Sequence, residues 1–593
     1  MSVPSKKQPQ VTDVPSSVDV ASRLNSWKEI AAYFDRDIRT VQLWEKHEAL
    51  PVHRHEHSSR SSVYAYPPEL DAWLRNRRQE KIAASPDPVV SKPPNPWLRN
   101  PRVGGLVAAV LLMALITWAW HLTHRQKEAT LWSGTEQTIA VLPFEDLSES
   151  GSSGLWVDGL TDDLITDLGK QGRLQVISRR SVMQFKANHQ PLPAIARQLQ
   201  ATLILEGSVM HENSRARITA QLLDAANDRQ IWAESYTRNT DDILSLQDDI
   251  AGDIATKVTA KLTGAATQAS FDLHPVDPQV RLAYLTGHYY LSQRDEPGLL
   301  KAIDFFKQAI AKDPNYAPAY SGLADSYNLL AVWGSLPSAE AFPQARTAAQ
   351  KALELDPSCA EAYNSLAFET YRYEWNFAQA ETFFRKAIQL NPNYATAHQW
   401  YGEYLGDLRR FDESIAELRK AKELDPLSAI IGSDLATGYI HAARDNEAIA
   451  ELQRILDLYP NFVPAHNYLA SCYSDLGDWA NAEKEALIYS RLTGNNSQFR
   501  VIRIEHDAHT GKLAQARTEL TAYLQDKNLI PFQKAQMYFT VGENDKGYAA
   551  LEQAFNEHSW WLVTLMVDPG FKSVPNDPRL QDLMKRVGLP VTI

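Results

Sequence analysis

Residues 395–426 of this 593-residue chain read ATAHQWYGEYLGDLRRFDESIAELRKAKELDP. Small and apolar residues recur at helical spacing in this stretch, and a proline ends its second helical segment. The same prolines recur along the chain at Pro314, Pro357, Pro392, Pro426 and Pro460. The last three intervals are 35, 34 and 34 residues, and the first is longer because of an insert near residues 333–343. This period predicts an all-α solenoid of helix pairs over residues 275–576, with a capping helix at 577–593.

The small and aromatic residues of each period resemble tetratricopeptide repeats. One pattern is Ala380-x3-Phe384-x2-Ala387, and another is Tyr401-Gly402-x2-Leu405. The resemblance implies an inner groove lined by the first helices, with a ladder of polar side chains that could bind an extended peptide backbone. The ladder consists of Asn364, Gln399, Ser433 and Asn467. The alternative is a solvated inner face that serves only as a spacer.

Residues 103–120 form an apolar run without any charge, VGGLVAAVLLMALITWAW. A run of this length predicts a membrane-spanning helix over residues 103–121, because a helix in a protein core normally has a polar face. The alternative is the central helix of a large domain. Basic residues are more frequent before the run than after it. The positive-inside rule therefore predicts a single-pass protein of the bacterial inner membrane, with a cytoplasmic N-terminus and a periplasmic C-terminal region.

Charge is divided unevenly between the two sides of this run. Residues 1–102 contain 16 Lys and Arg against 12 Asp and Glu, whereas the whole chain has 60 against 72 and a net charge of −12. A basic N-terminal part suits an anionic partner such as DNA. The two cysteines, Cys359 and Cys472, are too few and too far apart to indicate a disulfide framework or a metal motif.

Residues 21–82 carry the pattern of a winged helix-turn-helix domain. A disordered tail at 1–20 precedes it and a proline-rich linker at 83–102 follows it. Ser26 is placed to cap a first helix and Asp37 to cap a second. Two short strands around a polar turn and a third helix complete the domain.

The second helix and the wing resemble the DNA-binding head of the MerR and excisionase group. The resemblance is carried by R-T-V-x-x-W-E at residues 39–45 and by L-P at residues 50–51. It implies that the second helix enters the major groove and that the wing grips the phosphate backbone. The residues implied to contact DNA are Arg39, Thr40, Gln42 and Lys46 of the helix, Arg54 and Arg60 of the wing, and Tyr64.

Several features of the domain depart from that group. Asp35 and Arg36 occupy the turn, and Leu43 stands where a basic residue is common. Acidic residues dilute the positive field, so a head converted to protein binding is the alternative. A group of histidines could suggest a metal, but solvated histidines fit an exposed wing better, and we expect no metal site. The group consists of His47, His53, His55 and His57.

Residues 128–265 alternate between strand and helix patterns in the order β-α-β-α-β-β-β-α, which predicts an α/β domain. The phrases IAVLPF at 139–144, DGLTDDLITDL at 158–168 and LEGSV at 205–209 resemble the amino-terminal domain of TolB and its relatives. The resemblance implies a platform that binds a ligand or a protein. The segment has no nucleophile–base pair and no metal cluster, so we expect neither enzymatic activity nor a cofactor.

Together these segments predict a multidomain protein with a winged helix-turn-helix, a single transmembrane helix, an α/β domain and an all-α repeat solenoid. The order resembles membrane-anchored one-component transcriptional regulators, in which a DNA-binding head is coupled through one span to a sensor region. We expect DNA at the head, a protein or peptide at the repeats, and a possible homodimer that brings two heads to two half-sites. The alternative is an inner-membrane scaffold that organises envelope proteins and has a vestigial head.

Overall fold

The computed structural model describes most of the chain in two separate parts. The described residues are 23–34, 36–54, 63–74, 137–148, 154–172, 174–186, 190–212, 215–239, 243–263, 276–333, 336–571, 574 and 577–590. The chain divides into two compact units, Met1–His124 and Arg125–Ile593, and each is considered by itself. The predicted tail at 1–20, linker at 83–102 and membrane span at 103–121 lie outside the described residues.

The first unit contains two helices, a two-stranded hairpin and a third helix, in the predicted order. Its elements are α1 (Trp27–Tyr33), α2 (Ile38–Glu48), β1 (His53–Arg54), β2 (Val63–Tyr64) and a helix at 67–74. The Ser26 hydroxyl accepts a hydrogen bond from the Glu29 amide, and the Asp37 carboxylate accepts one from the Thr40 amide. Both helices are therefore capped by the residues that the sequence indicates.

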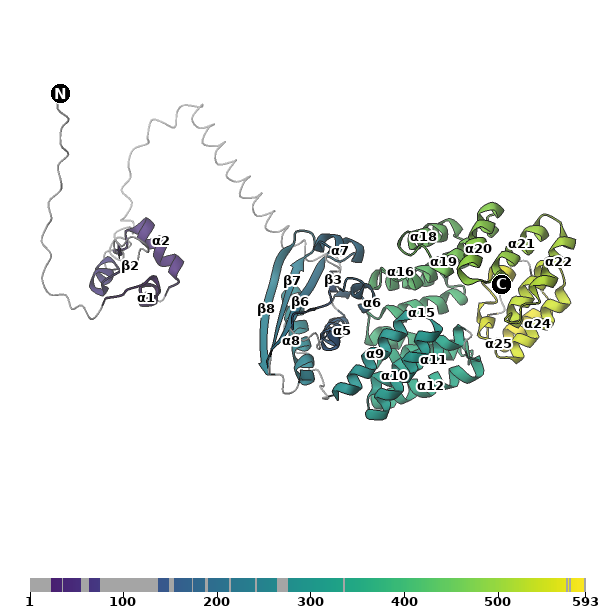
Figure 1. The fold of residues 1–593 in the computed structure, drawn as a ribbon, viewed down its shortest axis with the longest axis horizontal. Coiled ribbons are helices and arrows are strands. Elements are labelled where there is room, and N and C mark those ends of the chain that lie inside the picture. The colour runs from purple at the N-terminus through teal and green to yellow at the C-terminus, as the bar shows by residue number, and fades with distance from the viewer. Residues whose placement is uncertain are drawn as a thin grey trace, which may run out of the picture. The chain divides into compact units, whose positions relative to one another are not determined.

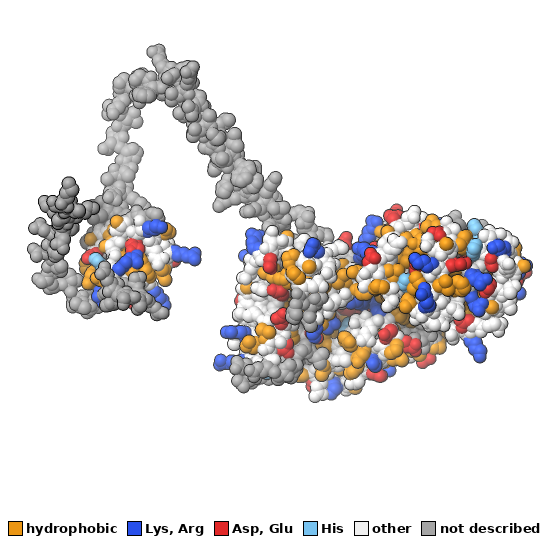
Figure 2. Space-filling model, turned by 45° about the horizontal axis from the view of Figure 1, so that its top comes forward, with side chains coloured by type: hydrophobic (Ala, Val, Ile, Leu, Met, Phe, Trp, Pro, Cys, Tyr) orange, Lys and Arg blue, Asp and Glu red, His pale blue; other side chains and the backbone are white. Residues whose placement is uncertain are grey.

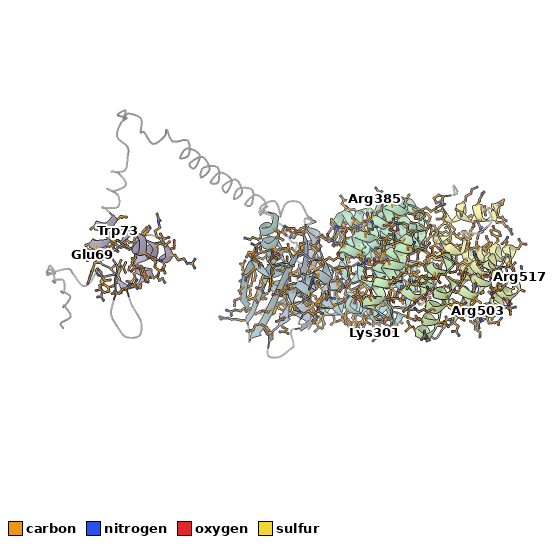
Figure 3. The ribbon with its side chains drawn as sticks, turned by 90° about the horizontal axis from the view of Figure 1, so that it is seen from above. Glu69, Trp73, Lys301, Arg385, Arg503 and Arg517 are labelled. Atoms are coloured by element: carbon orange, nitrogen blue, oxygen red, sulfur yellow. The ribbon has the colours of Figure 1, made fainter. Side chains whose placement is uncertain are left out.

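A small apolar core holds these three helices together. Ile30, Val41 and Leu70 are completely buried, and each comes from a different helix. Trp73 packs against this core from the third helix, on which Glu69 also lies (Figure 3). The inward side chains thus hold one face of α2 against the core, and the opposite face of α2 is exposed to solvent.

The second unit begins with a sheet of strand order β5-β3-β6-β7-β8, with β4 paired to β6 beside this path. Its elements are β3 (Thr138–Val141), β4 (Glu145–Asp146), α5 (Gly154–Lys170), β5 (Gln175–Val176), α6 (Arg179–Met183), α7 (Leu192–Leu199), β6 (Leu203–Glu212), β7 (Arg215–Asp224), β8 (Arg229–Asn239) and α8 (Ile243–Thr263). β3 runs parallel to β5 and β6, with Ile139 opposite Leu203. β6, β7 and β8 form an antiparallel meander.

Alternating side chains give this sheet two apolar faces near its centre. α5 and α8 cover one face, where Ile139, Leu205 and Ile218 are completely buried. α6 and α7 cover the other face over β3 and β6, around Ile204 and Leu199 (Figure 1). The strands are therefore enclosed between two helical layers.

The rest of the chain is a solenoid of antiparallel helix pairs, as the 34-residue period predicts (Figure 1). Its helices are α9 (Pro278–Gln293), α10 (Glu296–Lys312), α11 (Ala317–Val332), α12 (Ser338–Leu355), α13 (Ala360–Arg372), α14 (Phe377–Leu390), α15 (Ala395–Asp407), α16 (Phe411–Leu424), α17 (Ala429–His441), α18 (Asp445–Leu458), α19 (Val463–Asp475), α20 (Trp479–Thr493), α21 (Ser497–His509), α22 (Leu513–Tyr523), α23 (Pro531–Thr540) and α24 (Asn544–Asn556). The first helices of successive pairs, from α11 to α19, contact one another and form the inner layer. Lys301 and Arg385, which belong to second helices, lie at the outer surface (Figure 3).

Glycines lie where neighbouring helices of the solenoid approach closely. A Cβ atom on Gly402 of α15 would lie 2.6 Å from Leu418 Cγ of α16. A Cβ atom on Gly322 of α11 would lie 2.4 Å from the Phe306 ring of α10. Side chains do not pack this closely in protein interiors, so the glycines set the distance between the helices.

The C-terminal segment folds back onto the middle of the solenoid. It contains the short 3₁₀ helices η3 (Trp560–Thr564) and η4 (Pro569–Phe571), and α25 (Pro578–Val587). His558 stacks on Trp375 with ring centroids 4.2 Å apart, and its Nε2 atom lies 2.6 Å from the Tyr373 carbonyl oxygen. α25 belongs to an apolar cluster that also includes Trp375 and Phe377. The predicted capping helix therefore connects the last helix pair to the α13–α14 region.

The α/β domain is anchored on loops of the solenoid. The Asn393 amide, in the α14–α15 loop, donates to the carbonyl oxygens of Gly169 and Leu174, both at 3.0 Å. Its oxygen accepts from the Val176 amide at 2.9 Å. Leu427, in the α16–α17 loop, is buried in the apolar cluster beneath α6 and α7. The two segments share a core and form one body.

The predicted fold class and location are wrong in one respect. Among the residues described, no helix is both long and apolar enough to cross a membrane, which contradicts a single transmembrane helix and an inner-membrane location. The longest described helix, α8, has 21 residues but carries charged residues such as Asp253, Lys257 and Lys261. The architecture is instead mainly a helical repeat solenoid with a small sheet region.

Candidate functional site

The outward face of α2 carries most of the helix residues implied for DNA contact. Arg39, Gln42 and Lys46 are exposed at spacings of three and four residues, so they form one stripe. Thr40 is half-buried, and its hydroxyl donates to Asp37 at 2.6 Å. This bond and the Thr40 amide hold the pKa of Asp37 below its usual value. Arg39, Gln42 and Lys46 therefore share one exposed surface, whereas the Thr40 hydroxyl is bound to the Asp37 cap.

The described wing residues are tied to their neighbours. Arg54 on β1 forms an ion pair with Glu45 of α2, with Nη2 2.7 Å from Oε1. Tyr64 on β2 stacks on His53 with ring centroids 5.2 Å apart. Arg60 lies outside the described residues. Arg54 therefore has to exchange or share its carboxylate partner before it contacts a phosphate.

The histidines of this unit have structural partners where they are described. His53 Nε2, on the hairpin, lies 2.7 Å from Glu69 Oε2, on the third helix. His55 and His57 lie outside the described residues, and the side chain of His47 is not described. His53 thus serves to hold the hairpin against the third helix.

The exposed face of α2 combines donor groups with an apolar group. The stripe of arginine, glutamine and lysine offers donors for base edges and phosphates. Leu43 is 55% exposed beside this stripe and offers an apolar contact for a thymine methyl group. Asp37 and Glu45 flank the stripe and weaken its positive field.

The predicted polar ladder of the solenoid is largely buried. Its members are Asn364, which is 0% exposed, Gln399 at 2%, Ser433 at 3%, and Asn467, which is half-buried. Gln399 Nε2 donates to Asp434 at 2.6 Å, and the Ser433 hydroxyl donates to a carbonyl oxygen of its own helix. These positions lie in the inner layer, where successive first helices pack against one another. An open groove lined by all four side chains is therefore not present.

A charged cluster on the inner helices was missed in the sequence. Arg372 of α13 pairs with Glu403 and Asp407 of α15, at 2.8 and 3.7 Å. Asp434 of α17 lies next to them, hydrogen-bonded to Gln399. The sequence does contain a signal, because Asp407 follows Arg372 by one repeat period and Glu403 lies one helical turn before Asp407.

Burial changes the acidity of these carboxyl groups. It raises the pKa of Asp407 to about 7 against the attraction of Arg372. It also raises the pKa values of Glu403 and Asp434. The pKa of Asp325, on α11, is likewise raised by burial to about 7. Raised carboxyl pKa values of this kind are typical both of binding sites and of buried ion-pair networks.

The α/β domain has a cavity of about 640 Å³ on the face of the sheet that α7 partly covers. Ser208 and Thr219 share a hydrogen bond of 2.6 Å in its wall, and Gln221 donates to Glu206 at 2.6 Å. Burial raises the pKa of Glu206. The cavity has the size of a small-molecule site. The polar groups named here already satisfy one another.

Two parts of the chain match family models. Residues 135–252 match the second domain of HilA/YgeH-like transcriptional regulators, and residues 369–429 match the tetratricopeptide repeat. The second match confirms the predicted repeats. The first match places a regulator-type domain in the α/β segment, where the resemblance to TolB stays a prediction. The MerR and excisionase resemblance of the head also stays a prediction.

Individual relatives cover parts of the chain. It is 29% identical over 260 residues to putative adenylate cyclase 3 of Rhizobium meliloti, which covers 42% of this chain and 44% of the relative. It is 26% identical to Superkiller protein 3 of Schizosaccharomyces pombe, over 33% of this chain and 14% of the relative. The chain thus spans less than half the length of both.

Some solved structures are similar to part of the chain. Pseudomonas aeruginosa pilF is 23% identical, with a TM-score of 0.29, over 37% of this chain and 94% of that one. The type IV pilus biogenesis factor PilW is 19% identical, with a TM-score of 0.27, over 44% of this chain and 98% of that one.

Proposed function

We propose that this protein is a transcriptional regulator whose head binds DNA and whose repeats bind a protein partner. The match of residues 135–252 to HilA/YgeH-like regulators carries the proposal. The exposed stripe of Arg39, Gln42 and Lys46 supports the DNA-binding part, because these side chains donate hydrogen bonds to bases and phosphates. The tetratricopeptide repeats support the protein-binding part, since stacked helix pairs form extended binding surfaces.

On DNA, α2 enters the major groove. Arg39 and Gln42 read base edges and Lys46 contacts a phosphate. Arg54 joins the backbone contacts when a phosphate replaces Glu45 as its partner. Each phosphate contact releases counterions, so the affinity falls as the salt concentration rises. Two chains pair to bring two heads to two half-sites.

The repeats provide the input to this regulator. Asn393 and Leu427 join the solenoid to the α/β domain, so the two move together. A partner bound to the repeats therefore repositions the whole second unit. The proposed function has no enzymatic step, because the chain contains no cyclase or kinase motif.

A protein-binding scaffold is the second candidate. It is favoured by the ion pair between Arg54 and Glu45, which neutralises a wing residue. Asp37 adds a further negative charge near the N-terminus of α2. In that function the head contacts protein, and the repeats carry the main interaction.

DNA binding by the full-length chain tests the choice between the two. Labelled DNA from upstream of the protein's own coding sequence is titrated at salt concentrations between about 50 and 200 mM. We expect Arg39→Ala to weaken specific binding by about 1–3 kcal/mol, roughly five- to 150-fold. Arg503→Ala is the matched control, because Arg503 is 45% exposed on α21 in the second unit (Figure 3). Equal affinities for wild type and Arg39→Ala would refute DNA readout by α2 and favour the scaffold.

A further inference from the structure

The charged cluster on the inner helices contains more acids than bases. Arg372 is the ion-pair partner of both Glu403 and Asp407, at 2.8 and 3.7 Å. Asp434 lies beside them without an ion pair in the part of the chain that the structure describes, and it accepts a hydrogen bond from Gln399. The next basic group, Arg294, interacts electrostatically with Asp325, Glu403 and Asp434, so two arginines face four acids. The cluster therefore has a formal excess of two negative charges.

Gln399 shows where a hydrogen-bond donor is missing. Its Nε2 atom donates to Asp434, but its Oε1 atom is buried without a hydrogen-bond partner, and the residue is only 2% exposed. A buried oxygen without a donor destabilises the folded state until a donor reaches it. Solvent still reaches the neighbouring acids, because the Glu403 side chain is 23% exposed and Asp434 is half-buried. A donor group can therefore approach from the inner side of the solenoid.

We propose that Glu403, Asp434 and Gln399 bind the positively charged side chain of a lysine or arginine from the protein partner. The inference rests on the proposed function, in which the repeats bind a protein. An ammonium or guanidinium group has only donors, and two carboxylates with an amide oxygen supply only acceptors. Tyr468 lies close enough to Asp434 to interact with its charge, and its ring can pack on the aliphatic stem of the bound side chain.

An organic cation fits this acceptor set better than a metal ion. The described residues contain no group of three His, Cys, Asp or Glu side chains placed to hold a metal. Arg372 lies 2.8 Å from Glu403, and its positive charge repels a divalent metal ion at that carboxylate more strongly than it repels a singly charged side chain. A side-chain cation offsets one of the two excess negative charges and brings donors for the unpartnered oxygen.

The test compares peptides on the full-length protein. The probe is an acetylated and amidated octapeptide, Gly-Ser-Lys-Ser-Gly-Lys-Ser-Gly, with counterparts in which norleucine or glutamate replaces both lysines. Titration calorimetry up to about 1 mM peptide measures each affinity. We expect the lysine peptide to bind at least about tenfold more tightly than the norleucine peptide, a difference of roughly 1.4 kcal/mol.

The double variant Glu403→Gln/Asp434→Asn should lose this preference. The control Glu354→Gln/Glu413→Gln removes two acids from second helices, where the side chains are 66% and 58% exposed, and should keep it. Glu403→Gln breaks one ion pair of Arg372, which keeps Asp407 as a partner, and Asp434→Asn removes a carboxylate without an ion pair among the described residues. These two effects oppose each other, so the thermal unfolding temperature of the first variant should change little.

The inference is overturned if the wild type shows no lysine preference, or if the preference survives in Glu403→Gln/Asp434→Asn. Loss of the preference together with a clearly lower unfolding temperature would also contradict it, because the acids would then serve the fold. DNA binding is measured separately with Arg39→Ala. A chain that binds DNA without lysine preference refutes this inference alone, and one with lysine preference but no DNA binding refutes the regulator.

Discussion

Replacing Asn393 with alanine tests whether the α/β domain depends on the solenoid for its stability. The side chain makes three hydrogen bonds across the junction, to Gly169, Leu174 and Val176, with distances of 2.9–3.0 Å. One hydrogen bond contributes about 0.5–1.5 kcal/mol, and water can replace part of these half-buried ones. We therefore expect Asn393→Ala to lower the stability of the junction by about 2 kcal/mol.

The chain offers a matched control in an earlier repeat. Asn315 follows a proline and precedes a tyrosine, as Asn393 does. It lies in the loop between α10 and α11 and is exposed. Asn315→Ala removes the same atoms from the same loop type, so its effect should stay within about 0.5 kcal/mol.

Hydrogen exchange measured by mass spectrometry resolves this effect. The peptide that contains Val176 should exchange roughly 30-fold faster in Asn393→Ala than in wild type, which corresponds to about 2 kcal/mol. In urea, the α/β domain should unfold before the solenoid in this variant only. Equal exchange at Val176 in Asn393→Ala and Asn315→Ala would refute the coupling of the two segments through this side chain.

Two further predictions concern the solenoid. Its stability should fall as the pH rises from about 4 to about 7, because burial raises the pKa values of Asp325 and Asp407 from the ordinary aspartate value to about 7. The stabilising contribution of the two buried carboxyl groups is complete below the ordinary pKa of an aspartate and is lost as the pH passes the raised value. Asp407→Asn should therefore reduce the slope of the unfolding free energy against pH, measured by urea unfolding at several pH values. An unchanged slope would contradict this. Gly402→Ala should destabilise the solenoid by about 1–3 kcal/mol, since the new Cβ would meet Leu418. Gly169→Ala, whose Cβ would find its nearest neighbour at 3.4 Å, is the control, and equal urea midpoints would contradict the packing argument.

Local features were predictable because each depends on neighbouring residues. Ser26 and Asp37 cap their helices through amides three residues away, so sequence spacing is sufficient. The repeat period was predictable for a similar reason, since each helix pair packs mainly on the next pair. The order of strands and helices between residues 138 and 263 also follows from short-range patterns.

The candidate sites were predicted less completely, because their chemistry depends on burial and on partners from other elements. Equivalent repeat positions do identify Gln399, but only packing shows that it is 2% exposed and bound to Asp434. Arg54 is a basic wing residue in sequence, whereas its ion pair with Glu45 depends on how the hairpin meets α2. A motif defines which residues share a place in a repeat or helix, and not which of them remain accessible.

The sequence by itself determined the helix caps, the repeat period and the order of elements, because these arise within a few turns of chain. Only the tertiary structure decided that the α/β domain and the solenoid share a core, and that the C-terminal segment returns to the α13–α14 region. It also assembled Arg372, Glu403 and Asp434 from three helices into one charged cluster. Contacts between residues far apart in the chain have no periodic signal, since they depend on how complete surfaces fit together.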